Sequence, residues 1–529
     1  MNLKKLRFLQ KYLRSGAKCL PLLALAAMTA TPVHAFQFGE GDLRGSLDTT
    51  LSYGLIWRVQ ERSSKLVGIA NAPLNHGQGT ARSVNTDDGN LNYGRGVVSN
   101  AGKITSELGL DYQRFGLFVR GTGFYDYENM QGDRSKAKLT PEAKDLVGRD
   151  IRLLDAFIKA AFDLGTMPAQ LRLGDQVVSW GESTFIQNGI NILNPVNVNA
   201  LRLPGSEVKE ALIPEGMLWG SISPSQNTTF EGLYLYDWEE TDIDPPGTYW
   251  STNDFAGVGG SRVMLGFGRV ADTVPASTGA VVGRSADQEA SDSGQYGLAF
   301  RLFAPWFNDT EFGLYFINHH SRLPIINART GTAAAAAGVD PLGRTYAETA
   351  SYFLSYPEDI KLYGLSFNTL LRQNGIALQG EISYRDGAPL QVDDIELLFA
   401  ALSAQDNLSP GNTGAAPLAR FGQMGLAPFE AELPGFIKRD LVQVQATATK
   451  LFGPTLGANQ LAMVGEVGLT HVRDMPSKDV LRLDGQGTPI SGNAALARFH
   501  FADAPEVEPY SAFADATSWG YRLVGQIGR

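Results

Sequence analysis

Residues 47–59 alternate between apolar and polar side chains almost without exception. One set of positions is Leu47, Thr49, Leu51, Tyr53, Leu55, Trp57 and Val59, and the other is Asp48, Thr50, Ser52, Gly54, Ile56 and Arg58. A period of two places the two sets on opposite faces of a β-strand. This run is long for a strand of a soluble protein but suits one that crosses a bilayer at a tilt. The pattern therefore predicts a membrane-spanning strand.

The same alternation recurs along the chain. It is clearest at residues 376–385 and 441–450, and it also appears within residues 103–125, 154–163, 230–239 and 295–302. In a soluble β-sandwich the polar face of such strands is solvated, whereas in a membrane barrel it lines a wet lumen. The strand length, together with the leader described next, favours the barrel. We therefore predict an all-β fold, an antiparallel outer-membrane β-barrel of about 14–18 strands when complete.

The first 35 residues predict a signal peptide. Residues 1–18 contain six basic residues and no acidic one, and an apolar stretch from Cys19 to Ala30 follows them. Val33-His34-Ala35 then forms a small-x-small cleavage site. A retained anchor is the weaker alternative, because the apolar core is too short to span a membrane. Residues 36–529 are then a single barrel domain. Its 39 basic and 55 acidic residues, what remains of the chain's 45 and 55, disfavour nucleic acid as a partner.

Long irregular stretches separate the predicted strands. They cover residues 66–90, 271–293, 325–349 and 400–434 and are typical of the external loops of outer-membrane barrels. The stretch 181–226 stands apart, because it has no period-two face and contains four prolines, which central strands avoid. Two interpretations remain open for it: a plug or constriction inside the lumen, or a large external loop. Within it, Ser206–Leu212 is compatible with one short helix capped by the serine.

Several short motifs carry a resemblance to a known family. They are Arg172–Gln176, Ser179–Ser183, Asn194–Asn197 and Leu203–Gly205, with further matches at Asp87–Asn90, Tyr356–Ile360, Tyr363–Phe367 and Gly380–Arg385. This pattern resembles a family of Gram-negative exported proteins catalogued as domain of unknown function number thirteen-oh-two. The resemblance implies an outer-membrane protein, in some cases part of an export or uptake route for hydrophobic compounds. It also implies an inner-membrane efflux pump and a periplasmic protein as partners, besides outer-membrane lipid.

The resemblance also raises an expectation about the end of the chain. Members of the family continue through further strands to a terminal aromatic residue, whereas this sequence ends at Ile527-Gly528-Arg529. We therefore expect a barrel that is incomplete at its C-terminus. Because the first strand of a closed barrel pairs with the last, we expect one edge of the strand at 47–59 to be unpaired or to pair with a substitute.

The residues that we predict to line or gate the lumen are Glu182, Asn194, Arg202, Glu381 and Arg385. Their charges would keep the route wet and set its selectivity, as in other pores. The predicted function is passage or export of a hydrophobic or amphipathic small molecule. The alternatives are an outer-membrane lipid or ester hydrolase and a non-transporting surface scaffold.

The sequence offers little for catalysis, a cofactor or a metal, and we predict none of the three. His319 and His320 are adjacent, so in a strand they point to opposite faces and do not easily share one metal. An acidic cluster, Asp237, Glu239, Glu240, Asp242 and Asp244, suits calcium at an external loop, but a solvated loop end is the favoured interpretation.

Overall fold

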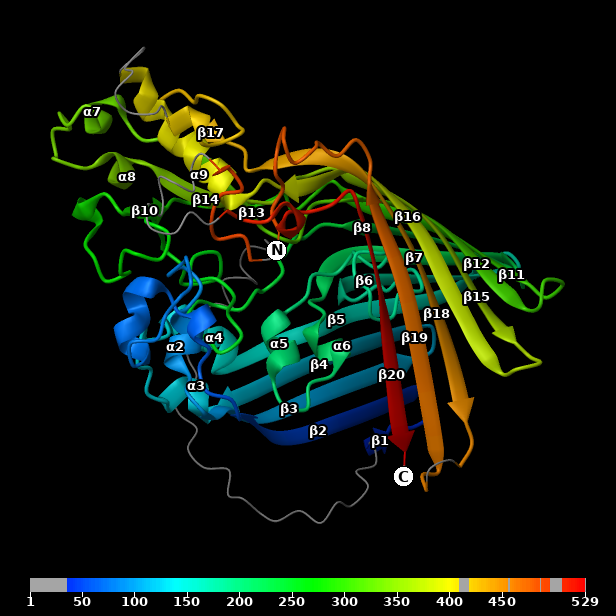
Figure 1. The fold of residues 1–529 in the computed structure, drawn as a ribbon. Helices are drawn as coiled ribbons and strands as arrows, with labels where there is room; N and C mark the ends of the chain where they lie inside the picture. The colour runs from blue at the N-terminus through cyan, green and yellow to red at the C-terminus, as the bar shows by residue number, and fades with distance from the viewer. Residues whose placement is uncertain (1–35, 409–417, 455–456, 486, 495–506, 529) are drawn as a thin grey trace.

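A computed structural model describes residues 36–408, 418–454, 457–485, 487–494 and 507–528. The predicted signal peptide, residues 1–35, lies outside the described residues. The strands form two sheets, a large one of fifteen strands and a small one of five. Figure 1 shows the large sheet curving around an interior, with the small sheet and most helices gathered at one end of it.

The large sheet is antiparallel throughout, and its strands follow one another in chain order. Its strands are β1 (Phe36–Phe38), β2 (Leu43–Arg58), β3 (Gly96–Tyr112), β4 (Phe115–Asp126), β5 (Arg149–Leu164), β6 (Met167–Gln176), β7 (Glu215–Ser225), β8 (Thr228–Leu235), β11 (Gln295–Ala304), β12 (Thr310–His319), β15 (Ile360–Leu371), β16 (Ile376–Gln391), β18 (Phe436–Phe452), β19 (Gln460–Val472) and β20 (Thr517–Gly528). The prediction of an all-β, antiparallel fold is confirmed.

The sheet is not closed. β20 pairs with β19 alone, and at the other edge the short β1 pairs only with residues 45–47 of β2. From Asp48 to Arg58 that edge of β2 has no strand partner among the described residues, whereas its other edge pairs with β3 along its full length. The expectation of an incompletely paired strand at residues 47–59 is confirmed.

Connections at the two ends of the large sheet differ in length. At one end, turns of two to seven residues join the strands, at 39–42, 113–114, 165–166, 226–227, 305–309, 372–375 and 453–459. At the other end lie the long connections 59–95, 127–148, 177–214, 236–294, 320–359, 392–435 and 473–516. This asymmetry matches the predicted arrangement of short turns and long loops.

The long connections are more ordered than the sequence predicts. They build the small sheet, in the order β17 (Glu432–Leu433), β13 (Ile325–Arg329), β14 (Ser351–Ser355), β10 (Val281–Arg284) and β9 (Arg262–Met264). They also form the helices α2 (Asp88–Asn92), α3 (Tyr127–Gln131), α4 (Pro141–Val147), α7 (Ala333–Ala336), α8 (Tyr346–Thr349) and α9 (Asp394–Ser403). The expectation of irregular loops at 271–293 and 325–349 is thus wrong in part. Central β14 is buried on consecutive positions, so such strands carry no alternation to detect.

Side chains on the large sheet alternate between an apolar outer face and a largely buried inner face. Exposed apolar side chains come from nearly every strand, including Leu51, Tyr53, Ile104, Ile151, Ile158, Leu173, Leu218, Tyr234, Leu298, Leu314, Leu365, Ile382, Val467 and Tyr521. Inward positions on β3, β16, β18 and β19 carry buried polar groups, namely Lys103, Thr105, Glu381, Ser383, Gln443, Gln445, Thr447 and Glu466. Among the described residues no helix is long and apolar enough to cross a membrane.

Candidate functional site

The connection between β6 and β7, residues 177–214, is here called the interior segment. It contains two short helices, α5 (Val198–Arg202) and α6 (Val208–Ala211), which Figure 1 shows within the curve of the sheet. We call residues 178–193 its first arm and residues 203–211 its second arm. The first arm is hydrogen-bonded to the inner faces of β16, β18 and β19, and the second arm to the inner face of β3. Of the two open interpretations, the structure therefore shows a segment inside the curved sheet rather than a loop projecting away from it.

The predicted irregular stretch 181–226 is too long at its C-terminal end. Residues 215–225 are strand β7, with Pro224 placed next to the β7–β8 turn. The inner face of β7 is apolar because Met217 and Trp219 pack against the interior segment, so the strand shows no polar face in the sequence. The short helix also differs in detail: α6 is capped by Glu207 rather than by Ser206, in a capping box with Glu210.

Glu381 of β16 holds the first arm of the interior segment. Its carboxylate is 3% exposed and accepts hydrogen bonds from the backbone N–H groups of Glu182, Ser183 (3.1 Å) and Ile190 (2.8 Å). Gln445 of β18 donates a further bond of 2.7 Å to the same carboxylate. Hydrogen bonds to a charged group contribute about 1.5–3 kcal/mol each, so this one side chain is a strong anchor.

Glu466 of β19 binds the adjoining turn of the chain in the same way. Its carboxylate is 2% exposed and accepts from the backbone N–H groups of Thr184 (2.9 Å), Phe185 (2.7 Å) and Ile186 (2.7 Å). Thr447 of β18 donates to it at 3.2 Å. Irregular backbone inside a sheet needs such partners, because a buried N–H without one costs free energy.

Carbonyl groups of the same arm are bound by donors from the sheet. Gln379 donates to Glu182 O at 2.8 Å, and Gln443 donates to Gln187 O at 2.9 Å. Arg385 donates to the carbonyls of Asn188 and Gly189, the latter at 3.2 Å. The inward polar side chains of β16, β18 and β19 thus replace the ladder partners that this irregular backbone lacks.

The second arm lies against the opposite part of the sheet. Lys103 of β3 forms a buried ion pair with Glu210 of α6 and donates to Gly205 O at 3.0 Å. Thr105, also on β3, donates to the second oxygen of Glu210 at 2.6 Å. A Cβ on Gly54 of β2 would lie 2.4 Å from Pro204, which shows how closely this arm approaches the strand. The interior segment therefore bridges strands from the two halves of the sheet.

An apolar cluster covers the remaining side of the interior segment. Val178, Trp180, Ile190 and Leu193 of the segment pack against inward side chains of β7, β8, β11, β12 and β15. Those side chains are Met217, Trp219, Leu233, Leu235, Ala299, Tyr315, Ile317 and Leu362. The first arm thus lies between an apolar wall and the polar wall formed by β16, β18 and β19.

The five predicted lumen residues fall into different surroundings. Glu182, Glu381 and Arg385 meet at the first arm, where the Glu182 side chain also accepts from Asn368 at 3.1 Å. Asn194 lies in the base of the segment and bonds Val178 N, Gln176 O and Ile213 O. Arg202 lies on α5, 3.4 Å from Asp244 and over the ring of Trp250. The structure brings three of the five together and leaves two apart.

Sequence analysis missed Glu466, Lys103 and Glu210 as site residues. Glu466 is the only acidic residue of β19, in the otherwise apolar run from Leu461 to Leu469. A lone carboxylate in such a run is expensive to bury unless it has partners, and that signal was available. The pairing of Lys103 with Glu210 could not be predicted from the sequence, because the two residues lie 107 positions apart and Glu210 is on a helix of only four residues.

The histidine pair and the acidic cluster noted in the sequence both have partners within the protein. His319 and His320 are both buried and have different partners: His319 Nδ1 lies 3.0 Å from His320 O, and His320 Nε2 lies 2.9 Å from Ser293 O. In the acidic cluster, Asp242 pairs with Arg152 at 2.9 Å and Asp244 pairs with Arg202. These carboxylates are therefore compensated by arginines.

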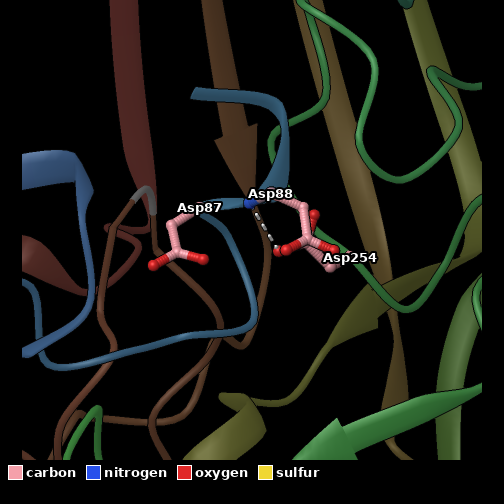
Figure 2. Close-up of side chains that lie close together, drawn as sticks. All are labelled: Asp87, Asp88 and Asp254. Carbon is pink, nitrogen blue, oxygen red and sulfur yellow. Dashed lines mark hydrogen bonds between the residues drawn. The ribbon is translucent and has the colours of Figure 1, made fainter. Parts of the chain in front are cut away.

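Two other groups of carboxylates lie close together among the described residues. In the first, shown in Figure 2, Asp88 N donates to Asp254 at 3.3 Å, while Asp87 accepts from Gly68 N at 2.8 Å and from Asn71. Burial and neighbouring acidic groups raise the pKa of Asp88 to about 7, although Lys136 and Arg262 act in the opposite direction. The second group, Asp393, Asp394 and Asp484, lies at the start of α9.

Comparison with known proteins gives a family and a set of distant structural neighbours. No curated protein matches the sequence. Salmonella typhi OmpF, solved in complex with daunomycin, has a TM-score of 0.29 and 7% identity over 93% of this chain and 99% of its own. Pseudomonas putida OprB has a TM-score of 0.29 and 10% identity over 80% and 79%, and the Acinetobacter baumannii outer membrane channel DcaP has 0.25 and 6% over 80% and 90%. Likenesses of this size carry no inference about activity.

The family assignment rests on the sequence. A model described as "protein of unknown function (DUF1302)" matches residues 17–528, nearly the whole chain. The match includes every motif from Asp87 to Arg385 on which the resemblance was based. The chain belongs to the DUF1302 family.

Proposed function

We propose that this protein is an outer-membrane channel, not an enzyme, that passes a hydrophobic or amphipathic small molecule through the inside of its curved sheet. The interior segment is the gate of this route. The single observation that carries the proposal is the attachment of the first arm of that segment to Glu381 and Glu466 through six backbone N–H groups.

The outer face of the large sheet supports a place in the membrane. Exposed apolar side chains of this extent are unusual on a soluble protein and mark a surface that contacts lipid or another protein. Outer-membrane barrels carry short turns on the periplasmic side and long loops outside. We accordingly place the turn end of the sheet in the periplasm, where a periplasmic protein and an inner-membrane efflux pump would meet it.

The two walls around the first arm support an amphipathic cargo. One wall offers aromatic and aliphatic side chains, among them Trp219 and Tyr315, and the other offers the carboxylates and amides of β16, β18 and β19. If the first arm moves aside, a molecule with an apolar body and a polar end finds a matching surface on each side. The same movement exposes Glu381 and Glu466, which lose their backbone partners.

Loosening the anchors tests the proposal. The double variant Glu381→Gln/Glu466→Gln keeps the side-chain volumes but removes both charges. Each glutamine has a single oxygen that accepts, so the donors at the other former carboxylate oxygen face an amide NH2 group and lose their acceptor. We expect flux of a small amphipathic dye into proteoliposomes to rise several-fold over the wild type. Glu432→Gln is the matched control, because Glu432 pairs with Arg329 in the small sheet. Equal flux through the wild type and the double variant would contradict the gate.

Fixing the arm gives the opposite result. Thr184 Oγ1 of the segment lies 3.3 Å from Thr447 Oγ1 of β18, so cysteines at these two positions are within reach of a disulfide after small side-chain rotations. The only native cysteine is Cys19, within the predicted signal peptide. We expect oxidised Thr184→Cys/Thr447→Cys to block flux and a reductant to restore it. Unchanged flux in the cross-linked protein would show that the arm is not the gate.

A further inference from the structure

Asp393 is a buried carboxylate whose charge is not compensated. Its side chain is fully buried (0% exposed) and directly precedes α9, yet it makes no capping bond to the helix. One carboxylate oxygen, Oδ1, accepts from Thr488 Oγ1 at 3.2 Å. The other, Oδ2, is buried and has no hydrogen-bond partner in the described part of the chain. A buried acceptor left without a partner costs free energy, and a charged one costs more.

The surrounding backbone brings two further carboxylates to the same place. Val392 and Leu483 form an antiparallel bridge, flanked by bonds from Asp393 N to Arg482 O (3.1 Å) and from Asp484 N to Gln391 O (3.0 Å). The bridge joins the end of β16 to the long connection between β19 and β20. It places one carboxylate oxygen each of Asp393, Asp394 and Asp484 within 4.8 Å of one another.

Positive charge nearby is already engaged elsewhere. Arg482 forms an ion pair with Glu396 (2.8 Å) and donates to Gly492 O (3.3 Å). Within the described ranges, none of the three aspartates forms an ion pair with a lysine or an arginine.

The other carboxylate group of the chain is different. There the fully buried Asp87 has both oxygens bonded, to Gly68 N and to the Asn71 amide, as part of a network that continues to Lys136. In Figure 2 the Asp88 and Asp254 carboxylates lie next to each other, and one carboxylate oxygen each of Asp87, Asp88 and Asp254 lies within 4.8 Å of the others. Asp88 Oδ1 and Asp254 Oδ1 are also buried without a hydrogen-bond partner in the described part of the chain, but the fully buried member of that group, Asp87, is satisfied. At α9 the fully buried member, Asp393, is itself the one with an unpartnered oxygen, which is why we assign the external cation to this group.

We propose that Asp393, Asp394 and Asp484 bind a calcium ion that ties the start of α9 to the connection between β19 and β20. All available donors are hard oxygens, which suit Ca²⁺ and offer nothing to a metal that prefers nitrogen or sulfur. Two of the three carboxylates are exposed, which leaves room for the water ligands that complete a calcium sphere. Ca²⁺ also tolerates the irregular geometry of a site drawn from two separate chain segments, whereas Mg²⁺ requires an octahedron.

Thermal unfolding of the full chain in detergent, first treated with a chelator, tests the site. We expect added Ca²⁺ to raise the apparent unfolding temperature, with half-saturation at roughly 0.1–1 mM, the range of extracellular calcium modules. Asp393→Asn/Asp484→Asn is expected to abolish the shift and to unfold in chelator at or above the temperature of the wild type, because the repulsion is relieved. Asp254→Asn, in the other carboxylate group, is the matched control and is expected to keep the full calcium response.

Three results would overturn the proposal. The first is a wild type that shows no shift at ~10 mM Ca²⁺, and the second is a shift that persists in Asp393→Asn/Asp484→Asn or disappears only in Asp254→Asn. The third is a response to Mg²⁺ without one to Ca²⁺. Asp484→Asn alone, at an exposed position, gives the same readout if replacement of the buried Asp393 prevents folding.

Discussion

Two glycines create the space in which Glu381 binds the interior segment. A Cβ on Gly189 would lie 1.8 Å from one carboxylate oxygen of Glu381, and a Cβ on Gly181 would lie 2.5 Å from the other. Gly181 also has a φ of +89°, in the left-handed region that favours glycine. Gly189 has no such constraint, so at that position the contact alone excludes a side chain.

Replacement of Gly189 by alanine tests the contact with Glu381 without adding backbone strain, because Gly189 does not have a positive φ. The added methyl group must displace Glu381 or the backbone of the first arm, so we expect a loss of about 1–3 kcal/mol in unfolding free energy, as for other overpacked sites. We also expect flux to rise, as for the glutamine variants at Glu381 and Glu466. Gly102→Ala in β3, where a Cβ meets nothing within 4 Å, is the control in urea unfolding. If both alanines cost the same, the close packing against Glu381 has no energetic weight.

Glu240, in the connection between β8 and β9, makes stability depend on pH. Burial, reinforced by Asp242, Asp287 and Glu289, raises the pKa of Glu240 to about 7 from 4.5. Between these two values the folded state holds a proton that the unfolded state has released, so unfolding becomes easier as the pH rises. Above pH 7 both states are ionised and the loss is constant.

Glu240→Gln should remove that dependence. The amide oxygen still accepts from Tyr356 O–H, which donates to Glu240 in the wild type. We expect the variant to gain stability over the wild type as the pH rises from about 4.5 to 7, and to keep that gain at pH 8. Urea midpoints of the two proteins across this range measure the difference, and parallel curves would refute the assignment.

At the scale of the element, the surroundings of a strand decide whether its sequence alternates between apolar and polar residues. β2 approaches the interior segment at Gly54 and Ser52, where the side chains are small or absent. Its inner face stays largely polar and its outer face apolar, so the alternation at residues 47–59 is evident in the sequence. β7 lies in the middle of the sheet, between β6 and β8, and Met217 and Trp219 on its inner face pack against the segment. With apolar side chains on both faces the period of two disappears.

The same reasoning explains which parts of the candidate site were predictable. Glu381 and Arg385 were found because they stand on the polar face of an alternating strand, β16. Their partners are backbone groups at residues 182–190, and no side-chain pattern reports where an irregular backbone directs its N–H groups. Lys103 and Glu210, 107 residues apart, meet only through the curvature of the sheet. Periodicity gives faces, whereas pairing across the interior needs the three-dimensional fold.

At the scale of the whole molecule, two kinds of exposed leucine have different surroundings. Leu298, within β11, is 60% exposed on the outer face of the large sheet, among the apolar side chains of neighbouring strands. Leu342 is 77% exposed in the long connection between β13 and β14, beside the polar Asp340 and Arg344. If the outer face contacts lipid, an arginine is costly at the first position and harmless at the second.

We therefore expect Leu298→Arg to impair insertion into lipid vesicles and Leu342→Arg to leave it unchanged. An arginine on the lipid face of a barrel near the bilayer midplane costs about 2–4 kcal/mol, whereas a loop arginine remains in water. The folded fraction after dilution from urea into vesicles, measured by protease protection, reports the difference. In detergent micelles, which adapt around a charge, the difference in folded fraction between the two variants should be smaller. Equal insertion of both variants would contradict a lipid-facing position for Leu298, because hydrocarbon penalises a charge there and not at Leu342.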